Sequence, residues 1–428
     1  MSRLLLVAPP FSGHLNPLMA MGRHLRERGH EPIFVTAPAR VPLLRDLGFD
    51  VAPVLTSDPT ALERIADTPR RVGSNPIRMG QQLKANIDLM PVVLAELRTL
   101  TDRLQPDLVL ADFTAPVAGL VAAERSLPWI TSMPTPFALE TRSGTPAYCG
   151  GWLPPTHAGA RARDALGRGL TRTVKRTFGI IFREHLDRLG TSIYRPDGTE
   201  ASYSPTAILG LGLPELEFPR SWPAALSLIG PITAAPEPDP HLPGILDSVR
   251  PRILVTLGTH LTWAKTDLLA RVRRLSGEIP THDFVVTWGH PPAPGAPPST
   301  TTTVDGRIHV VDYLPYDAAL PAFEAVIHHG VAGIAYSTLR AGLPALVWPR
   351  DYDQPDFAAR LVHAGVALRT RDLGSPRSIG QLQTVLSGLD ASARHRLRMA
   401  VRDSDPLDAT ARAVDAHLTG AGRRGGLS

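Results

Sequence analysis

The stretch from Ala325 to Gly342, AVIHHGVAGIAYSTLRAG, constrains the fold of this 428-residue chain more than any other. Its apolar start predicts a short buried strand that ends at His328 and His329, and the glycines that follow allow a sharp bend. A helix is expected over 335–339, with Gly342 closing it. A strand, a glycine turn and a helix start bring free N–H groups and the positive end of the helix dipole together. This arrangement predicts an anion site.

The candidate anion-binding residues are those of the turn and of the helix start. Either histidine can add a side-chain donor beside a phosphate oxygen, and packing beneath the sheet is the alternative for each. The set comprises His328, His329, Gly330, Val331, Ala332, Gly333 and Ile334.

A polar pair follows the next expected strand. Asp353 and Gln354 come after the apolar run 346–348 and precede a helix expected over 356–363. The carboxyl ends of neighbouring parallel strands meet at one edge of a sheet, so this pair is expected beside the anion site. A carboxylate and an amide at that place suit the hydroxyl groups of a sugar.

These two stretches resemble the C-terminal signature of the GT-B glycosyltransferases that use nucleotide sugars. The similarity is to the bacterial group that resembles macrolide, sterol, rhamnolipid and carotenoid glycosyltransferases. Two positions depart from the family, because Ile334 replaces a phosphate-binding threonine and Phe357 stands where many members have asparagine. The resemblance implies an α/β fold in which two Rossmann-like, doubly wound domains face each other across a cleft. The family pattern HHG-x-x-GT…AG-x-P…P…DQ falls without gaps on His328, His329, Gly330, Gly333, Ala341, Gly342, Pro344, Pro349, Asp353 and Gln354.

The N-terminal residues also indicate a doubly wound sheet. Apolar runs at 3–8 and 32–36 flank a helix expected over 18–28, with Asn16 as its N-cap and Pro17 at its first position. Strand, helix and strand within so short a span imply a right-handed crossover. The first turn contains only Gly13 and lacks GxGxxG, so a nicotinamide dinucleotide is not expected.

His14 and Asp112 are the candidate catalytic residues. His14 follows the first strand and Asp112 lies at the carboxyl end of the strand expected over 106–113, so both should project into the cleft. The family's GH-x-NP loop matches residues 13–17, and Asp112 falls where the family places the partner aspartate. The resemblance implies that His14 deprotonates an acceptor hydroxyl while Asp112 orients the imidazole and stabilises its charged form. A single displacement at the anomeric carbon predicts inversion of configuration.

The second half of the chain supplies further candidate donor-binding residues. Gly258 and Thr259 follow the strand expected over 253–257 and form another loop of the kind that meets phosphate. By resemblance, Tyr313 would stack on the nucleotide base, and Tyr316 replaces the glutamine of the family's W-x-P-Q motif. Many UDP-sugar enzymes of the family bind the ribose hydroxyls with a glutamate at the position where this chain has Tyr336. The absence of this carboxylate favours a dTDP-sugar as the donor without excluding a UDP-sugar. No cofactor other than this donor substrate is expected.

Aromatic residues on loops form the candidate acceptor site. They are Phe11, Phe137, Tyr148 and Trp152, which can line an apolar pocket or simply pack on the domain surface. The helix-prone segment 161–188 carries eight basic and three acidic residues. It can touch an anionic membrane or a lipid-linked acceptor, and a solvated helix face is the alternative.

Composition excludes several classes of protein. With 43% hydrophobic and 20% charged residues, the chain is typical of a globular protein, and its length fits two domains. The net charge of +5 does not indicate a nucleic-acid partner, because the basic residues are spread and only three of 45 are lysine. A single cysteine, Cys149, excludes an intramolecular disulfide and a cysteine zinc site, and it favours the cytoplasm. No apolar run is long enough to span a membrane.

The expected domain limits follow from a proline-rich stretch. An N-terminal, acceptor-binding domain is expected over 1–231, a linker over 232–243, a nucleotide-sugar-binding domain over 244–418 and a tail over 419–428. The last helix of the second domain can pack back on the first. The loop 291–303 is expected to be exposed.

The predicted function is transfer of a hexose or deoxyhexose from a UDP- or dTDP-sugar to a hydroxyl of a hydrophobic small molecule, such as a polyketide, macrolide or lipid. Asp351 and Asp353 form a nominal DxD metal motif, but their place beside Gln354 favours sugar recognition, so no metal is expected. One alternative is a non-catalytic protein that binds a sugar nucleotide or activates another transferase. A second is a nucleotide-sugar epimerase or hydrolase. Both a monomer and a homodimer fit the sequence.

Overall fold

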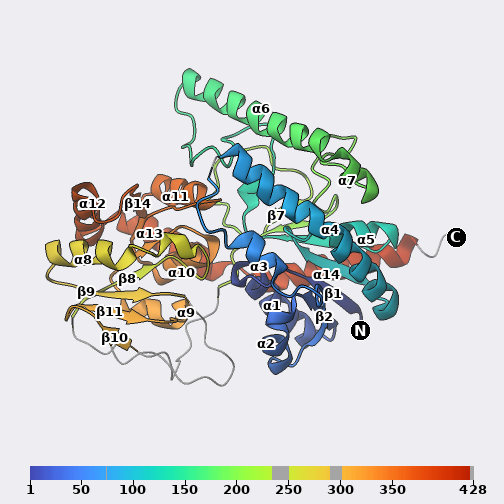
Figure 1. Cartoon of the computed structure of the whole chain (residues 1–428), viewed down its shortest axis with the longest axis horizontal. Helices are drawn as coiled ribbons and strands as arrows, with labels where there is room; N and C mark the ends of the chain where they lie inside the picture. The colour runs from blue at the N-terminus through green and yellow to red at the C-terminus, as the bar shows by residue number, and fades with distance from the viewer. Residues whose placement is uncertain (74, 234–249, 290–300, 425–428) are drawn as a thin grey trace.

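The chain forms two α/β domains, each built on a seven-stranded sheet (Figure 1). The computed structural model describes residues 1–73, 75–233, 250–289 and 301–424. All neighbouring strands of the first sheet run parallel. Their order is β3 (Asp50–Pro53), β2 (Glu31–Thr36), β1 (Arg3–Val7), β4 (Leu108–Asp112), β5 (Trp129–Met133), β6 (Ile208–Gly210) and β7 (Leu226–Leu228).

The second sheet is parallel except for one edge strand, β10, which pairs antiparallel with β11. Its central strand β8 is buried at every position, as a continuously apolar strand covered on both faces should be. These two sheets confirm the expected pair of doubly wound domains. The order is β10 (Thr301–Thr303), β11 (Ile308–Val311), β9 (Asp283–Thr287), β8 (Arg252–Thr256), β12 (Ala325–His328), β13 (Ala345–Val347) and β14 (Ala367–Arg369).

Helices cover the faces of both sheets (Figure 1). Those of the first half of the chain are α1 (Ser12–Glu27), α2 (Val41–Asp46), α3 (Ala61–Ala66), α4 (Pro76–Leu104), α5 (Pro116–Glu124), α6 (Ala158–Ile181) and α7 (Arg183–Arg188). Those of the second half are α8 (Leu268–Glu278), α9 (Tyr316–Ala319), α10 (Ala332–Ala341), α11 (Gln354–His363), α12 (Pro376–Ser387), α13 (Ala391–Asp403) and α14 (Pro406–Arg424). Short 3-10 helices are Pro38–Arg40, Pro136–Ala138, Thr262–Ala264 and Leu320–Ala322.

Several expected boundaries were wrong. The first helix begins at Ser12 rather than at 18, so Pro17 lies inside it. Residues 301–303 form the edge strand β10 instead of loop, and the expected tail is helical as far as Arg424. The strands β3 and β14 were not expected at all. The expected linker lies outside the described residues from 234 onward.

The last helix leaves the second domain and packs on the first. Ala411 and Val414 of α14 are buried in the core of the N-terminal domain. Asp408 accepts a hydrogen bond from the His24 imidazole at 2.8 Å, and the Arg28 guanidinium lies within ion-pair distance of the same carboxylate. Residues 406–424 therefore belong in space to the N-terminal domain.

A buried ion pair joins the domains near the carboxyl edges of the sheets. Arg360 of α11 donates to the Glu217 carboxylate at 2.9 Å, and both side chains are almost fully buried. The Arg360 guanidinium also lies over the rings of Phe137 and Phe218 of the N-terminal domain. A paired and stacked arginine of this kind fixes one relative orientation of the domains, because separating the pair would leave a buried charge alone. Within the described part of the chain, no helix is long and apolar enough to cross a membrane.

Candidate active site

His14 and Asp112 lie in contact at the carboxyl edge of the first sheet. His14 is in the first turn of α1, directly after β1, and Asp112 is the last residue of β4. Because β1 and β4 are neighbours in the sheet, residues 98 positions apart meet here. The His14 Nδ1 atom lies 3.0 Å and 3.1 Å from the two carboxylate oxygens of Asp112. A proton on Nδ1 leaves Nε2 as the free basic atom.

The carboxylate of Asp112 is held in place from a second direction. Its side chain is completely buried, and it accepts hydrogen bonds from the Thr114 backbone N–H, at 2.9 Å, and from the Thr114 hydroxyl. Burial alone would lower the pKa of His14. The charge and hydrogen bond of Asp112, with a smaller effect of Asp353, outweigh burial and raise that pKa above 6.5. The His14 ring is 25% exposed and stacks on Phe113, so it remains open to a small molecule.

The start of α10 offers an anion site made of backbone. No side chain caps this helix, and its first internal hydrogen bond runs from the Ala335 N–H to the Val331 carbonyl. The N–H groups of the first turn are thus available to a ligand. Gly330 has a φ of +95°, and a Cβ atom there would come within 2.9 Å of the Val347 side chain. Only glycine permits this turn between β12 and α10.

The two histidines before the turn are buried and neutral at pH 7. Burial lowers the pKa of His328 to about 3, and burial together with the nearby cations lowers that of His329 to about 3. Neither ring nitrogen of His328 has a hydrogen-bond partner among the described residues. The His329 ring lies against Gly258, where a Cβ would be 2.9 Å away. Neither imidazole therefore adds a positive charge to the anion site.

The two expected departures from the family pattern have structural consequences. The side chain of Ile334 is buried in the core with Leu254 and Val326, so only its backbone N–H can meet a ligand. Phe357 packs edge-on against Phe137 of the N-terminal domain, with ring centroids 4.8 Å apart. Tyr336 lies in the same buried cluster. This position, where a ribose-binding glutamate is usual by resemblance, is therefore part of the domain interface.

Asp353 and Gln354 have different partners. The amide oxygen of Gln354 accepts hydrogen bonds from the backbone N–H groups of Arg350 and Asp351, at 2.7 and 3.0 Å, and so fixes the loop after β13. Asp353 accepts a 3.0 Å hydrogen bond from the Thr135 hydroxyl, which follows β5 in the other domain. Burial raises the pKa of Asp353, against the opposing effects of Thr135 and of the His14 charge. Asp353 therefore shares the cleft with His14.

The nominal DxD motif is divided between two structural tasks. Both carboxylate oxygens of Asp351 accept backbone hydrogen bonds across the cleft, from Val72 at 2.7 Å and from Gly73 at 2.8 Å. Asp353 points instead toward Thr135. Within the described ranges, no group of three or more His, Cys, Asp or Glu side chains is arranged to hold a metal ion.

The loops after β8 and β9 lie under a buried lysine. The Lys265 ammonium donates to the Trp288 carbonyl at 2.7 Å and to the Thr259 carbonyl at 3.4 Å. Burial, against a weak opposing effect of Asp67, lowers the pKa of Lys265 to about 8. No carboxylate of the described chain lies within ion-pair distance of it. A positive charge without a counter-ion therefore lies beside Gly258 and Thr259.

The two tyrosines expected at the nucleotide base are both partly buried. The Tyr316 hydroxyl is 2.7 Å from the Thr256 hydroxyl at the end of β8, and its ring packs against the core of the second domain. Burial raises the pKa of Tyr316 to about 12. Tyr313 lies in the loop between β11 and α9 and is partly buried, as Tyr316 is, so its stacking on a base stays a prediction.

Two of the four expected acceptor residues lie at the cleft. Phe11 packs edge-on against His14 and against His260 of the second domain, with centroid distances of 6.2 and 5.1 Å. Tyr148 is 51% exposed, and its backbone N–H donates a 3.0 Å hydrogen bond to the Asp356 carboxylate. These positions are compatible with contact to an acceptor.

The other two expected acceptor residues have packing partners within the protein, and their role at the acceptor stays a prediction. Phe137 is fully buried between Phe357 and Arg360, where it serves the domain interface. Trp152 lies against Gly167 of α6, and the Arg163 guanidinium covers its ring. Both rings find apolar or cationic partners that the loop sequence does not reveal.

Sequence analysis missed several residues of this site: Phe113, Thr114, Thr135, His260 and Lys265. Phe113 and Thr114 directly follow Asp112, and their proximity to His14 could have been found from the expected end of that strand. Thr135 and His260 depend on how the domains face each other, which no local pattern encodes.

Two facing doubly wound domains, with a histidine–aspartate pair on one side and an uncapped helix start on the other, form the GT-B fold. Comparisons with known proteins agree. Residues 294–403 match the family model described as "Erythromycin biosynthesis protein CIII-like, C-terminal domain". The family model and the relatives point to a nucleotide-sugar-dependent glycosyltransferase of the GT-B fold, family 1.

Relatives and a solved structure cover nearly the whole chain. It is 28% identical to 4'-demethylrebeccamycin synthase of Lentzea aerocolonigenes in an alignment of 427 residues. This alignment covers 94% of this chain and 97% of that protein. The chain is 25% identical over 400 residues to a zeaxanthin glucosyltransferase of Pantoea ananas, with 92% and 90% covered. The structure of the Streptomyces sp. SF2575 glycosyltransferase SsfS6, complexed with thymidine diphosphate, is similar, with a TM-score of 0.64 at 19% identity. The superposition covers 97% of this chain and 100% of that one.

Proposed function

We propose that this enzyme transfers a hexose or deoxyhexose from a nucleotide diphosphate sugar to a hydroxyl group of a hydrophobic small molecule, with inversion at the anomeric carbon. The observation that carries the proposal is the His14–Asp112 pair, which faces the cleft opposite the start of α10. Nε2 of His14 takes the proton of the acceptor hydroxyl as its oxygen attacks the sugar. Asp112 stabilises the imidazolium that forms.

The leaving diphosphate would be stabilised from the second domain. Negative charge grows on its oxygens as the glycosidic bond breaks, and free N–H groups with the dipole of α10 stabilise such charge best when they are fixed beforehand. The neutral imidazoles of His328 and His329 can add N–H donors. We place Asp353 at the sugar hydroxyls, because its carboxylate lies between the two halves of the site.

The proposed donor is a dTDP-sugar, with a UDP-sugar as the alternative. Tyr336 is buried in the domain interface and offers no carboxylate to a ribose. A deoxyribose lacks one of the hydroxyls that such a carboxylate would hold. The likeness to a glycosyltransferase complexed with thymidine diphosphate supports the same choice.

A single experiment tests the function. The purified chain is incubated with dTDP- and UDP-sugars, with and without a panel of hydroxylated hydrophobic acceptors, and free nucleotide is measured. Release that requires an acceptor supports transfer. Release without any acceptor would indicate a hydrolase, a change of the sugar without release an epimerase, and binding without turnover a non-catalytic protein.

We expect the Lys265→Met variant to bind dTDP or UDP roughly 10 to 100-fold more weakly than the wild type, because a hydrogen-bonded charge beside the diphosphate is lost. Thymidine and uridine, which carry no phosphate, should bind with unchanged affinity. Calorimetry on the four ligands measures both effects. The Lys84→Met variant is the control, since Lys84 lies exposed on α4 in an ion pair with Asp88. An equal loss for nucleoside and diphosphate would mean that Lys265 only supports the loops.

EDTA should leave the transfer rate unchanged. The carboxylates of Asp351 and Asp353 are engaged by separate hydrogen bonds, so they do not form a joint site for a divalent ion. The rate is measured after dialysis against EDTA and again after addition of Mg²⁺. Loss of activity that Mg²⁺ restores would contradict this expectation.

We also propose a cytoplasmic enzyme that touches membranes through the segment 161–188. Its helix α6 lies along the outside of the N-terminal domain (Figure 1). Leu166, Leu170 and Ile180 are 76%, 64% and 75% exposed on it, and no acidic residue occurs between Asp164 and Glu184. Such a face favours an anionic lipid surface. Sedimentation with vesicles of anionic and of neutral lipid tests this. Binding to neither kind of vesicle, or equal binding to both, would contradict it.

A further inference from the structure

A small pocket lies between the segment 137–148 and the inner face of α6. Its volume is about 210 Å³. Its lining includes apolar residues such as Leu139 and Pro146, together with five basic side chains and a single acidic one, Glu140. Such a pocket fits a molecule that has an apolar part and an anionic part.

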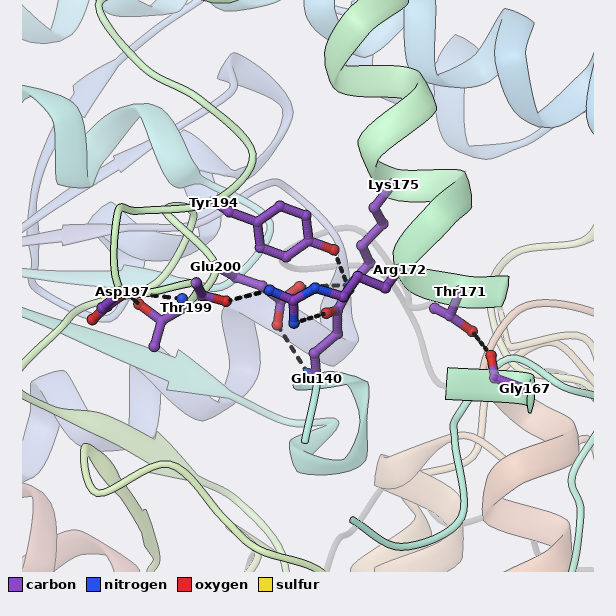
Figure 2. A network of polar contacts seen from close by, with 10 residues as sticks. Glu140, Gly167, Thr171, Arg172, Lys175, Tyr194, Asp197, Thr199 and Glu200 are labelled. Atoms are coloured by element: carbon purple, nitrogen blue, oxygen red, sulfur yellow. Dashed lines mark hydrogen bonds and ion pairs between the residues drawn. The ribbon is translucent and has the colours of Figure 1, made fainter. Parts of the chain in front are cut away.

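Part of this charge is neutralised within the protein (Figure 2). The Lys175 ammonium lies 2.6 Å from the Glu200 carboxylate and 3.1 Å from that of Glu140. The Arg172 guanidinium is 3.4 Å from Glu140, and the Tyr194 hydroxyl donates to the same carboxylate at 2.5 Å. Two cations and two carboxylates thus balance, and the network fixes α6 against the loop at 140.

Two other guanidinium groups of the lining are not neutralised. Arg168 donates to the Gly144 carbonyl, and Arg220 donates to the carbonyls of Phe137 and Thr145 at 3.1 and 2.7 Å. Neither lies within ion-pair distance of a carboxylate of the described residues. The buried Nε atom of Arg220 has no hydrogen-bond partner there.

The desolvated charge of Arg220 is costly as it stands. Burial lowers the pKa of Arg220 to about 10, with the Arg360 charge acting in the same direction. The carboxylate of Glu217 acts in the opposite direction, but it is already bonded to Arg360. The partners of the Arg220 guanidinium are carbonyl groups and the Trp222 ring, whose centroid is 4.9 Å away, so an anion that enters the pocket would meet a cation that has no carboxylate partner.

The pocket adjoins the reacting groups. Tyr148 belongs to its lining and is half exposed. The backbone N–H of Tyr148 donates to the Asp356 carboxylate of α11 at 3.0 Å, and Asp353 is the N-cap residue of that helix. Tyr148 therefore joins the pocket to the side of the cleft on which Asp353 lies.

We propose that this pocket is an acceptor subsite for a carboxylate, held by Arg168 and Arg220. The acceptor is then a hydroxylated, largely apolar molecule that carries an acidic group. Arginine suits this role because its planar fork binds both oxygens of a carboxylate. This inference rests on the proposed transferase function and specifies its acceptor.

The test compares a hydroxylated apolar carboxylic acid with its methyl ester as acceptors, using the full chain and the donor that supports turnover. The wild type should show a KM for the acid roughly tenfold or more below that for the ester. The Arg168→Met variant should raise the KM for the acid about tenfold, with kcat and the KM for the ester unchanged. Arg176→Met, on the exposed face of the same helix, is the matched control and should change neither.

Calorimetry of the acid alone keeps this test separate from the test of catalysis. If no acceptor is glycosylated but the acid binds and Arg168→Met weakens it, the proposed function fails and the subsite stands. Equal KM values for acid and ester in the wild type would overturn the subsite. An equal effect of Arg168→Met and Arg176→Met would overturn it as well.

Discussion

The His14→Ala variant should lower the turnover number by roughly 10² to 10⁴-fold while the fold stays intact, as expected when a general base is removed. An alcohol holds its proton near pH 7, and no other described imidazole in the cleft is paired with a carboxylate as His14 is. The ring is one-quarter exposed, and Asp112 keeps its hydrogen bonds from Thr114 when the imidazole is removed, so we expect the variant to fold. Steady-state kinetics and thermal melting of the variant measure both parts of the expectation.

The control for this variant is His24→Ala. His24 lies on the same helix but is bonded to Asp408 of α14, far from the cleft. It should lose some stability and little activity. The affinity of the His14→Ala variant for dTDP should equal that of the wild type, because the leaving group binds in the other domain. A His14→Ala enzyme that turns over within a few-fold of the wild type would remove His14 from the mechanism.

Asp112→Asn should lower turnover by roughly 10² to 10⁴-fold and also change the pH dependence. His14 acts in its neutral form, so kcat/KM rises with pH as the imidazole loses its proton. In the wild type this acid limb should lie above 6.5, since Asp112 raises the pKa of His14. The amide of asparagine carries no charge, so the limb should move to lower pH. Profiles of kcat/KM between about pH 5 and 9 measure the shift.

Thr114→Val is the matched variant for this measurement. It removes the hydroxyl that donates to Asp112 but keeps the carboxylate and its backbone hydrogen bond. Its acid limb should stay close to that of the wild type. If Asp112→Asn leaves the limb where it was, the titrating group of the profile is not His14.

The elements that could be predicted from the sequence are those with continuous apolar runs. β1, β4, β8 and β12 are buried on both faces, and this burial is visible in the sequence as runs without alternation. β3 and β14 are short and partly exposed, so their runs do not stand out. The start of α1 was misplaced because proline normally occurs in the first turn of a helix. Here Pro17 lies inside the helix, four residues after Gly13, whose carbonyl would otherwise accept the N–H that proline lacks.

The candidate site could be predicted where it depends on the ends of strands within one domain. His14 and Asp112 meet because strand order in a doubly wound sheet makes β1 and β4 neighbours. Contacts across the cleft could not be predicted in this way, because strand order within one domain does not determine how the two domains face each other. Phe137 was expected at an acceptor, and its contact with Phe357 was not foreseen, because the facing surface of α11 decides this partner. The bond between Thr135 and Asp353 depends on the same facing surfaces.

The two backbone bonds of Asp351 have a consequence for the order of events in a catalytic cycle. They hold residues 72 and 73 of the first domain against the loop that follows β13 in the second. Spent nucleotide diphosphate must leave through the space that these domains enclose, so we expect the bonds to open once per turnover. We then expect release of the nucleotide, rather than bond formation to the acceptor, to limit the turnover rate at saturating substrate.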